Sequence, residues 1–338
     1  MLPATQRCIL LRAYPRGVPA ESDFEHVERP VGEPRNGQVL VETRLLSLDP
    51  APRLRMNAAS RDVPPLALGA VVPGRGVGVV LRSCHPDWRE GDVVAGELGW
   101  QEYPLLDPAG LRRVDPALGP ASAALGLLGP SGIAAWCLLR IAAPVRRGET
   151  VVVAAAAGAV GSTLVQLARH DGARVVALVA SAAQARFVRD ELAADAVLDC
   201  NADGFPVTLD AALPAGADLF LDSVGGAVHE AVVERIAVHG RVVAFGYISA
   251  YNGDGGAPRE YGRIFRLIHR RATLSGFLVG DHAARFPEAL RDLAALLRAG
   301  SLRNHEQFID GLARAPAAFA GLFTGDPVGK QLLRVRGT

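Results

Sequence analysis

The sequence contains few cysteines, and they are widely spaced. Only four occur in 338 residues, Cys8, Cys84, Cys137 and Cys200, and no two of them form a C-x-x-C pair. This spacing argues against a disulfide framework and against a structural zinc cluster. His85 follows Cys84, but no third ligand stands at a metal-binding spacing. We therefore expect free thiols in a reducing compartment and no bound metal.

The sequence also lacks an excess of either charge and any long apolar run. Lys and Arg number 36 against 35 Asp and Glu, so no net field favours nucleic acid or an anionic membrane. The apolar stretch 151–161 contains glycine and ends well short of the roughly 20 residues of a membrane span. Residues 1–17 lack the apolar core of a signal peptide. The expectation is a cytoplasmic protein that binds neither nucleic acid nor membranes.

Two hydrolase signatures are absent. The chain has no G-x-S-x-G elbow and no H-E-x-x-H pair, so neither the α/β-hydrolase nor the zinc-protease interpretation has support.

With 49% hydrophobic and 21% charged residues the composition is that of a globular protein. Its length is sufficient for two domains, each with its own core.

The first part of the chain, about 125 residues, has the pattern of short strands broken by glycine and proline. The predicted strands are Gln38–Glu42 and 76–83. Gly91-Asp92 is a predicted turn that precedes a further strand at Val93-Val94. Helical periodicity is nearly absent. This part is expected to form an irregular antiparallel barrel or sandwich.

The pattern changes after residue 121. Helical spacing over 121–141 surrounds a Gly-Pro-Ser-Gly interruption, and the apolar run Thr150–Ala157 is typical of a strand buried on both faces of a parallel sheet. Alternation of strands and helices then predicts right-handed βαβ units in a doubly wound sheet. The predicted elements are a helix at 162–170, strands at 174–180, 196–199, 218–222 and 241–246, a helix at 283–299 and a strand at 331–335.

A glycine motif lies directly between the first buried strand and its helix. Its residues are Ala155, Gly158 and Gly161, spaced A-x-x-G-x-x-G. Gly158 permits a tight turn and close approach of a pyrophosphate, Gly161 lets the helix pack on the strand, and the helix N-terminus attracts the anion. Because the flanking strands and helix are all present, the motif predicts dinucleotide binding.

The end of the second strand bears on which nicotinamide cofactor is bound. Enzymes that use NAD place an acid there to accept from the ribose hydroxyl. Here the strand ends Val179-Ala180-Ser181, and no acid follows until Asp190. This leaves room for the 2′-phosphate of NADPH. Arg186 is the nearest cation that could pair with the phosphate.

Ordered motifs along nearly the whole chain resemble the leukotriene B4 dehydrogenase/prostaglandin reductase family. This group of zinc-free medium-chain dehydrogenases/reductases includes plant alkenal double-bond reductases and curcumin-reductase-like enzymes. The matching residues are Ser47-Leu48-Asp49-Pro50 with Arg53, Gly74-x-Gly76-Val77-Gly78, Gly91-Asp92-x-Val94, Gly99-Trp100-Gln101-Glu102-Tyr103, Gly158-Ala159-Val160-Gly161-Ser162, Asp222-Ser223-Val224-Gly225-Gly226, Gly246-x-Ile248-Ser249-x-Tyr251-Asn252, Gly276-Phe277 and Gly329-Lys330.

The resemblance implies an α/β protein with a Rossmann doubly wound parallel sheet and a GroES-like β-rich catalytic domain. The expected boundaries are 1–125 for the GroES-like domain, 126–304 for the Rossmann domain and 305–338 for a return to the catalytic domain. The family further implies a homodimer paired through the Rossmann domains. The implied reaction is NADPH-dependent reduction of the C=C bond of an α,β-unsaturated ketone or aldehyde. This unsaturated carbonyl compound is the expected small-molecule substrate.

The resemblance also assigns roles to individual residues. Tyr251 is expected to donate a hydrogen bond to the substrate oxygen on which enolate charge develops, or only to position the ribose, and Asn252 to brace the same loop. The expected cofactor contacts are Ala155, Gly158, Ala159, Val160, Gly161, Ser181, Gln184, Arg186, Cys200, Ser223, Gly246, Ile248, Phe277 and Lys330. The expected substrate pocket comprises Ala51, Tyr103, Trp136, Tyr251 and Tyr261.

Several positions depart from the family pattern. Gln184 stands where a lysine grips the 2′-phosphate, and Cys200 replaces the tyrosine that assists it. Loss of such a charge-assisted bond costs roughly 1.5–3 kcal/mol, so the preference for NADPH is expected to be weaker, with NADH as an alternative. Ala51 replaces a tyrosine and enlarges the expected pocket. The other departures are Pro130, Ala134, Trp136 and Pro327.

Two further functions stay open at this point. Loss of the phosphate contacts is compatible with an enzyme of this fold that isomerises or cyclises a biosynthetic intermediate without redox turnover. The third interpretation is a non-catalytic dinucleotide-binding sensor or scaffold, against which the intact Tyr251-Asn252 pair argues. Oxidation of NADPH in the presence of an enone separates the first function from the other two.

Overall fold

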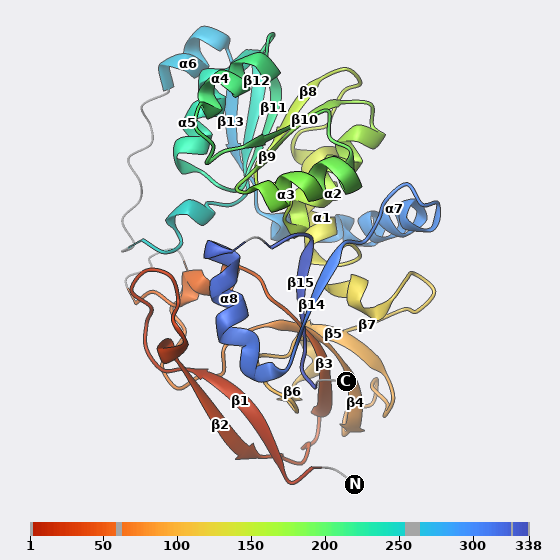
Figure 1. The fold of residues 1–338 in the computed structure, drawn as a ribbon. Coiled ribbons are helices and arrows are strands. Elements are labelled where there is room, and N and C mark those ends of the chain that lie inside the picture. The colour runs from red at the N-terminus through yellow and green to blue at the C-terminus, as the bar shows by residue number, and fades with distance from the viewer. Residues whose placement is uncertain (1–2, 59–62, 254–263, 326, 337–338) are drawn as a thin grey trace.

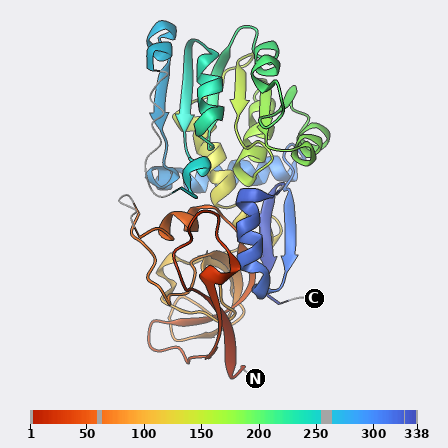
Figure 2. The same cartoon turned by 60° about the vertical axis from the view of Figure 1, so that its left-hand side comes forward.

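The chain folds into two lobes with a waist between them. The structure is a computed structural model that describes residues 3–58, 63–253, 264–325 and 327–336. The upper lobe in Figures 1 and 2 is built on a parallel sheet with helices on both sides, and the lower lobe is rich in strands. Both termini lie in the lower lobe.

The upper lobe contains a six-stranded sheet in which every neighbouring pair is parallel. Its strands, in spatial order, are β10 (Ala196–Asp199), β9 (Arg174–Val179), β8 (Thr150–Val153), β11 (Ala217–Asp222), β12 (Ile236–Ala244) and β13 (Thr273–Gly276). The helices of this half of the chain are α1 (Pro130–Cys137), α2 (Ala159–His170), α3 (Ala182–Phe187), α4 (Phe205–Ala212), α5 (Gly226–Glu234), α6 (Ile264–Arg270) and α7 (Phe286–Arg298).

Both faces of this sheet are buried, as expected for a doubly wound fold. Val151 and Val153 of β8 belong to one apolar core, together with residues of α1, α2 and α7. Val152, between them, belongs to a second core with residues of α4 and α5. Alternate side chains of a strand point to opposite faces, so an uninterrupted apolar run fills both cores.

The lower lobe contains a seven-stranded sheet and a separate two-stranded one. The large sheet has the order β14-β15-β3-β4-β5-β7, with β6 paired to β3; it is antiparallel except between β14 and β15. Its strands are β3 (Val39–Ser47), β4 (Arg75–Ser83), β5 (Val93–Glu97), β6 (Leu105–Leu106), β7 (Arg112–Arg113), β14 (Glu306–Asp310) and β15 (Lys330–Arg334). The smaller sheet pairs β1 (Thr5–Leu11) with β2 (Phe24–Pro30).

An aromatic cluster joins the end of the chain to its beginning in this lobe. The ring of Trp100 stacks on Phe24 and meets Phe319 edge-on, with centroids 5.6 Å apart in both pairs. Phe319 lies on α8 (Ala315–Thr324). Residues 306–334 therefore add two strands and a helix to a lobe whose other strands precede residue 114. The domain boundaries expected at 125 and 304 remain predictions.

Short helical turns connect many of these elements. They are η1 (Glu21–Asp23), η2 (Ala51–Arg55), η3 (Pro108–Gly110), η4 (Ala121–Leu125), η5 (Leu138–Ala142), η6 (Val188–Leu192), η7 (Ile248–Ala250), η9 (Val279–Arg285) and η10 (Leu312–Arg314).

Several elements differ from those expected. The helical stretch at 121–141 is divided into η4, α1 and the π-helical η5, because α1 starts at Pro130, which is suited to a first helical turn. The strand expected at 241–246 runs from Ile236 to Ala244. The helix expected at 283–299 is η9 followed by α7. No prediction was made for β1, β2, β13, β14 or α8.

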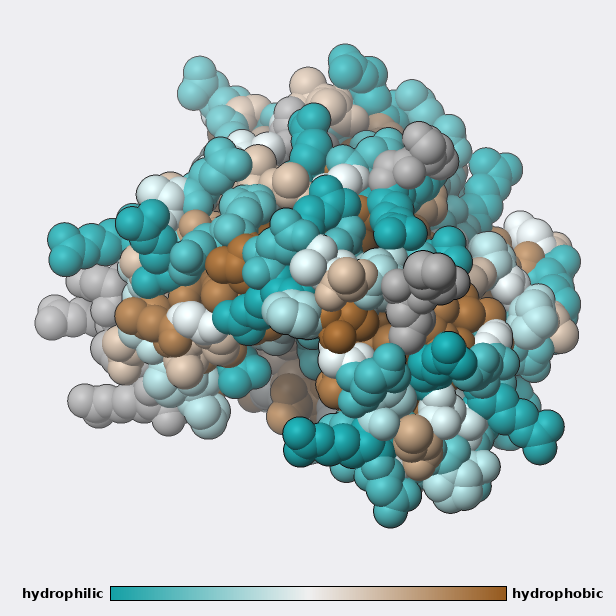
Figure 3. All heavy atoms as spheres, turned by 90° about the horizontal axis from the view of Figure 1, so that it is seen from below, coloured by the Kyte–Doolittle hydropathy of each residue, from teal (hydrophilic) through white to brown (hydrophobic). Residues whose placement is uncertain are grey.

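The surface carries no continuous apolar belt in the view from below. Figure 3 shows polar side chains surrounding smaller apolar areas on this face. Within the described ranges, no helix combines the length and apolarity that crossing a membrane requires.

Candidate active site

A cleft of about 950 Å³ lies between the lobes and is lined by residues of both. The upper lobe contributes the segments that follow the carboxyl ends of β8, β9, β11 and β12, which is where ligands bind in open parallel sheets. The lower lobe contributes η2 and the beginning of β4. The expected site residues that line the cleft are Ala51, Ala155, Gly158, Ala159, Val160, Gly161, Gln184, Cys200, Ser223, Gly246, Ile248, Tyr251, Asn252 and Lys330.

The glycine motif forms the turn between β8 and α2. Gly158 caps α2 in an extended conformation, so the first turn of this 12-residue helix borders the cleft. A Cβ atom on Gly161 would lie 2.2 Å from the carbonyl oxygen of Ala155, which no side chain can occupy. Amides at a helix N-terminus lack intrahelical acceptors and attract anions. The cleft volume and this turn fit a dinucleotide with its pyrophosphate at α2.

The end of β9 offers only neutral groups to a 2′-phosphate. Gln184 Oε1 accepts from the Ala180 amide at 3.0 Å, and its Nε2 donates to the Pro327 carbonyl at 3.3 Å. Ser181 caps α3 by accepting from the Gln184 amide. Burial and the charge of Asp199 raise the pKa of Cys200 to about 12, which keeps the thiol neutral. The second neutral amide in this part of the cleft is Asn201, which donates to the Ala180 carbonyl.

The turn after β11 is held by a buried carboxylate. Asp222 is 2% exposed, and its Oδ1 accepts from the amides of Val224 and Gly225 at 2.9 Å each. Its Oδ2 lies 2.7 Å from Nδ1 of His229 on α5. Three contacts on one carboxylate fix the turn that brings Ser223 to the cleft.

The loop after β12 carries Tyr251 and Asn252. The amides of Ile248 and Ser249 donate to the carbonyls of Ser223 and Val224, both at 3.1 Å. The loop is thereby tied to the turn after β11. Burial raises the pKa of the Tyr251 phenol, against a smaller opposite effect of the Tyr247 backbone. The phenol therefore keeps its proton at neutral pH and can donate a hydrogen bond.

An ion pair closes the cleft from the side of the lower lobe. Lys330, at the start of β15, is 3% exposed, and its Nζ binds Oδ1 of Asp49. Burial raises the pKa of Asp49, but Lys330 and a hydrogen bond from Ser47 outweigh it, so the pKa of Asp49 lies below its usual value. The Asp49 carboxylate is consequently charged at neutral pH, and it is paired with the Lys330 side chain.

Glu97 is a second carboxyl group in the cleft wall. It accepts from the Gly74 amide, and burial raises its pKa. Arg75, directly across the β4–β5 ladder, acts in the opposite direction. The sequence did not predict four of the polar residues in the cleft wall, because only the pairing of distant strands places them at one cavity. They are Asp49, Arg75, Glu97 and Asn201.

Other expected residues lie outside the cleft. Ser181 is the N-cap of α3 and Arg186 lies in the last turn of that helix; neither residue lines the cleft, and Arg186 is exposed. Trp136 is buried in the upper lobe, where Nε1 donates to Asp292 at 3.0 Å.

Three aromatic residues complete the set of expected positions. Phe277 stacks on His282, with ring centroids 5.2 Å apart. Tyr103 is buried under Arg336 in the lower lobe. Neither ring lines the cleft. Tyr261 is outside the described residues.

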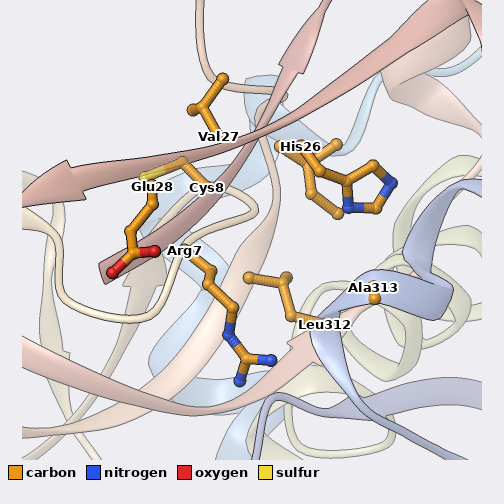
Figure 4. Close-up of a pocket in the computed structure, with 8 residues that line it drawn as sticks. Arg7, Cys8, His26, Val27, Glu28, Leu312 and Ala313 are labelled. Carbon is orange, nitrogen blue, oxygen red and sulfur yellow. The ribbon is translucent and has the colours of Figure 1, made fainter. Parts of the chain in front are cut away.

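A smaller cavity of about 210 Å³ lies between β1, β2 and η10 (Figure 4). Arg7, Cys8, His26 and Leu312 are among its lining residues. It is smaller than ordinary ligand pockets, which measure roughly 300–1,000 Å³. The Arg7 side chain is already paired with Glu102. The large cleft is therefore the candidate active site.

A doubly wound sheet with a glycine turn, facing a β-rich lobe across a shared cleft, defines a nicotinamide-dependent medium-chain dehydrogenase/reductase. Residues 7–114 match the family model for the N-terminal domain of oxidoreductases, and residues 159–295 match the model called zinc-binding dehydrogenase. Within the part of the chain that the structure describes, no group of three or more His, Cys, Asp or Glu could hold a metal ion.

Characterised relatives cover almost the entire chain. The NADPH-dependent curcumin reductase of Escherichia coli (strain K12) is 36% identical over 333 residues, 97% of this chain and 96% of that protein. The NADP(+)-dependent 2-alkenal reductase of Nicotiana tabacum is 32% identical over 334 residues, with coverage of 97% and 96%. The crystal structure of CurA from Vibrio vulnificus in complex with NADPH has a TM-score of 0.92 at 31% identity, covering 98% of this chain and 100% of CurA.

The chain belongs to the family of zinc-free medium-chain reductases that contains the alkenal, curcumin and prostaglandin reductases. It is accordingly an NAD(P)H-dependent oxidoreductase. The expected family, fold class and enzyme class are confirmed.

Substitution of Gly158 tests the cofactor turn. Gly158→Asp should abolish dinucleotide binding, because it places a carboxylate against the pyrophosphate. Gly158→Ala is the matched control: its Cβ would lie 3.3 Å from the Ala155 carbonyl oxygen, tight but uncharged, so binding should weaken far less. Thermal-shift titration with NADPH measures both. Unchanged NADPH affinity in Gly158→Asp would show that this turn does not hold the pyrophosphate.

Proposed function

We propose that this enzyme uses NADPH to reduce the C=C bond of an α,β-unsaturated ketone or aldehyde. The observation that carries the proposal is the placement of the Gly158 turn, Tyr251 and Asn252 in one cleft. The named activities of the relatives, which reduce curcumin and 2-alkenals, support the substrate class. Ala51, at the start of η2, lines the cleft with a small side chain and leaves room for a bulky substrate.

The protein contributes binding, orientation and charge stabilisation to this reaction. NADPH, when bound, would supply the hydride to the β-carbon, and a proton from solvent would add to the α-carbon to complete the reduction. The backbone around Gly158 and Gly161 would hold the pyrophosphate and thereby orient the nicotinamide. The Tyr251 phenol donates to the carbonyl oxygen, on which negative charge grows as the enolate forms. These donors act more strongly in a cleft than in water, because its walls exclude solvent.

Tyr251→Phe tests the proposed electrostatic role. The substitution removes one donor to the developing enolate oxygen, for which a loss of about 10²-fold in kcat is typical. NADPH consumption with a panel of small enones measures the rate, and NADPH titration should give a nearly unchanged dissociation constant. If kcat stayed within twofold of the wild type, the phenol would have no part in the chemistry.

Because the side chains that line the cleft near Gln184 are neutral, we predict a modest preference for NADPH over NADH. Gln184→Lys should lower the dissociation constant of NADPH about tenfold or more and leave that of NADH unchanged, because a charge-assisted bond to phosphate is worth roughly 1.5–3 kcal/mol. Titration of both cofactors against wild type and variant measures the effect. Selective loss of NADPH binding in Arg186→Ala would identify Arg186 as the existing partner, and equal affinities for both cofactors in all three proteins would contradict the prediction.

We also propose that the protein is a homodimer formed through the upper lobe. Strand β13 lies at one edge of the parallel sheet, and an exposed edge with apolar side chains invites pairing with another chain. Leu274 on β13 is 44% exposed, and Phe265 on α6 is 71% exposed. Ile268 and Leu278 are further exposed apolar residues of this region.

The free cysteines fit a cytoplasmic location.

A charge at the sheet edge tests the dimer. Leu274→Lys should convert the dimer into monomers, because an edge lysine opposes strand pairing. Val207→Lys is the matched control: Val207, on α4, is 71% exposed but lies on a helix away from the edge. Size-exclusion chromatography with light scattering gives the mass of each. A monomeric wild type, or a dimer that survives Leu274→Lys alone, would refute this interface.

A further inference from the structure

Arg53 of η2 is a buried cation, and its hydrogen-bond partners among the described residues are all neutral. Its side chain is 1% exposed. Nη1 donates to the Met56 carbonyl at 3.1 Å, and Nη2 donates to the carbonyls of Gly17 and Pro15 at 3.0 and 3.3 Å. Burial lowers the pKa of the guanidinium, against the charge of Asp23. Burying a charge without a hydrogen-bonded counterion is costly, and none of the described residues that accept from Arg53 is a carboxylate.

A further donor of Arg53, its Nε–H group, reaches across the waist to the loop after β12 in the upper lobe. Nε donates to Oδ1 of Asn252 at 3.1 Å. Arginine has only donors, so it can bind the amide oxygen of an asparagine and never the amide nitrogen. Arg53 therefore determines the orientation of the Asn252 amide, and the NH2 group must point away from the guanidinium.

The NH2 group of Asn252 is available to a ligand. Asn252 lines the cleft, and its Nδ2 has no hydrogen-bond partner among the described residues. This nitrogen is also absent from the buried, unpartnered polar atoms of the described chain, which are Thr43 Oγ1 and His305 Nε2. Nδ2 is thus an accessible and unused donor, and it belongs to the residue that directly follows Tyr251.

We propose that Asn252 is a second catalytic donor, which binds the carbonyl oxygen of the substrate through Nδ2, and that Arg53 is the positioning residue that keeps this donor directed into the cleft. The inference rests on the proposed enone reduction. No proton is transferred from Asn252. Its amide stabilises the enolate oxygen beside the Tyr251 phenol, and the cation behind it polarises the amide.

A merely structural role is the alternative, in which Asn252 braces the loop through its contact with Arg53. Asn252→Asp separates the two roles, because it keeps an oxygen for Arg53 and removes the donor. Asn252→Ala removes both without adding a charge. Asn36→Asp adds the same charge at an exposed position of the lower lobe and serves as the control.

The experiment compares steady-state reduction of one enone, NADPH titration and thermal unfolding for these three variants, for Arg53→Met and for the wild type. Asn252→Asp and Asn252→Ala should each lower kcat at least about tenfold, as expected for loss of one oxyanion donor. The Asp variant should keep the NADPH dissociation constant within about threefold and the unfolding temperature of the wild type. Asn36→Asp should leave all values unchanged. Arg53→Met should also lower kcat, because the side-chain amide of Asn252 can then rotate and exchange the positions of its oxygen and its NH2 group.

Each result decides between the possibilities. Wild-type kcat in Asn252→Asp would show that the residue only braces the loop and would overturn the inference. A fall in Asn252→Asp without one in Asn252→Ala would indicate charge repulsion and would overturn it as well. If Arg53→Met does not fold, the two Asn252 variants still decide. Failure of the wild type to oxidise NADPH with any enone would instead remove the proposed function, and with it this inference.

Discussion

The close approach of Gly329 to the cofactor turn is the contact on which the cleft depends. Its amide donates to the Ala157 carbonyl at 2.7 Å, and Gly329 pairs with Gly158 as an isolated parallel bridge. Gly329 has φ +62°, and a Cβ there would lie 2.4 Å from the His305 carbonyl oxygen. Only glycine fits. Because β15 begins at the next residue, this contact attaches the sheet of the lower lobe to the turn at the start of α2.

Two buried cations, Lys330 and Arg53, then distinguish the two parts of the cleft. Lys330 is neutralised by Asp49, so it adds no net charge beside the cofactor turn. Among the described residues, Arg53 is hydrogen-bonded only to neutral groups, one of which is Asn252, so its charge remains where the proposed reaction builds an enolate. At the far end, near Gln184, the lining side chains are neutral. In the proposed reaction the charge of Arg53 would lie next to the chemistry, whereas the described side chains that line the cleft near Gln184 are neutral.

The sequence predicted those parts of the fold that neighbouring residues determine. The turn from β8 to α2 depends on Ala155, Gly158 and Gly161, and the family resemblance rests on similar short motifs. Some residues expected at the cofactor or the substrate do not line the cleft, and for Trp136 the reason is a distant hydrogen-bond partner. The Trp136 indole nitrogen donates to Asp292, 156 positions away. The edge strand β13, exposed and only four residues long, has too little apolar pattern to be recognised.

The sequence by itself determined the family, the parallel sheet, the glycine turn and the absence of an acid after β9. Each of these is encoded in a short stretch, because the period of buried residues and the demand for glycine are local properties. Only the tertiary structure decided that Asp49 meets Lys330 and that Arg53 meets Asn252, 281 and 199 positions apart. Such pairs depend on how two lobes pack, and no local pattern records which side chain a buried charge will find.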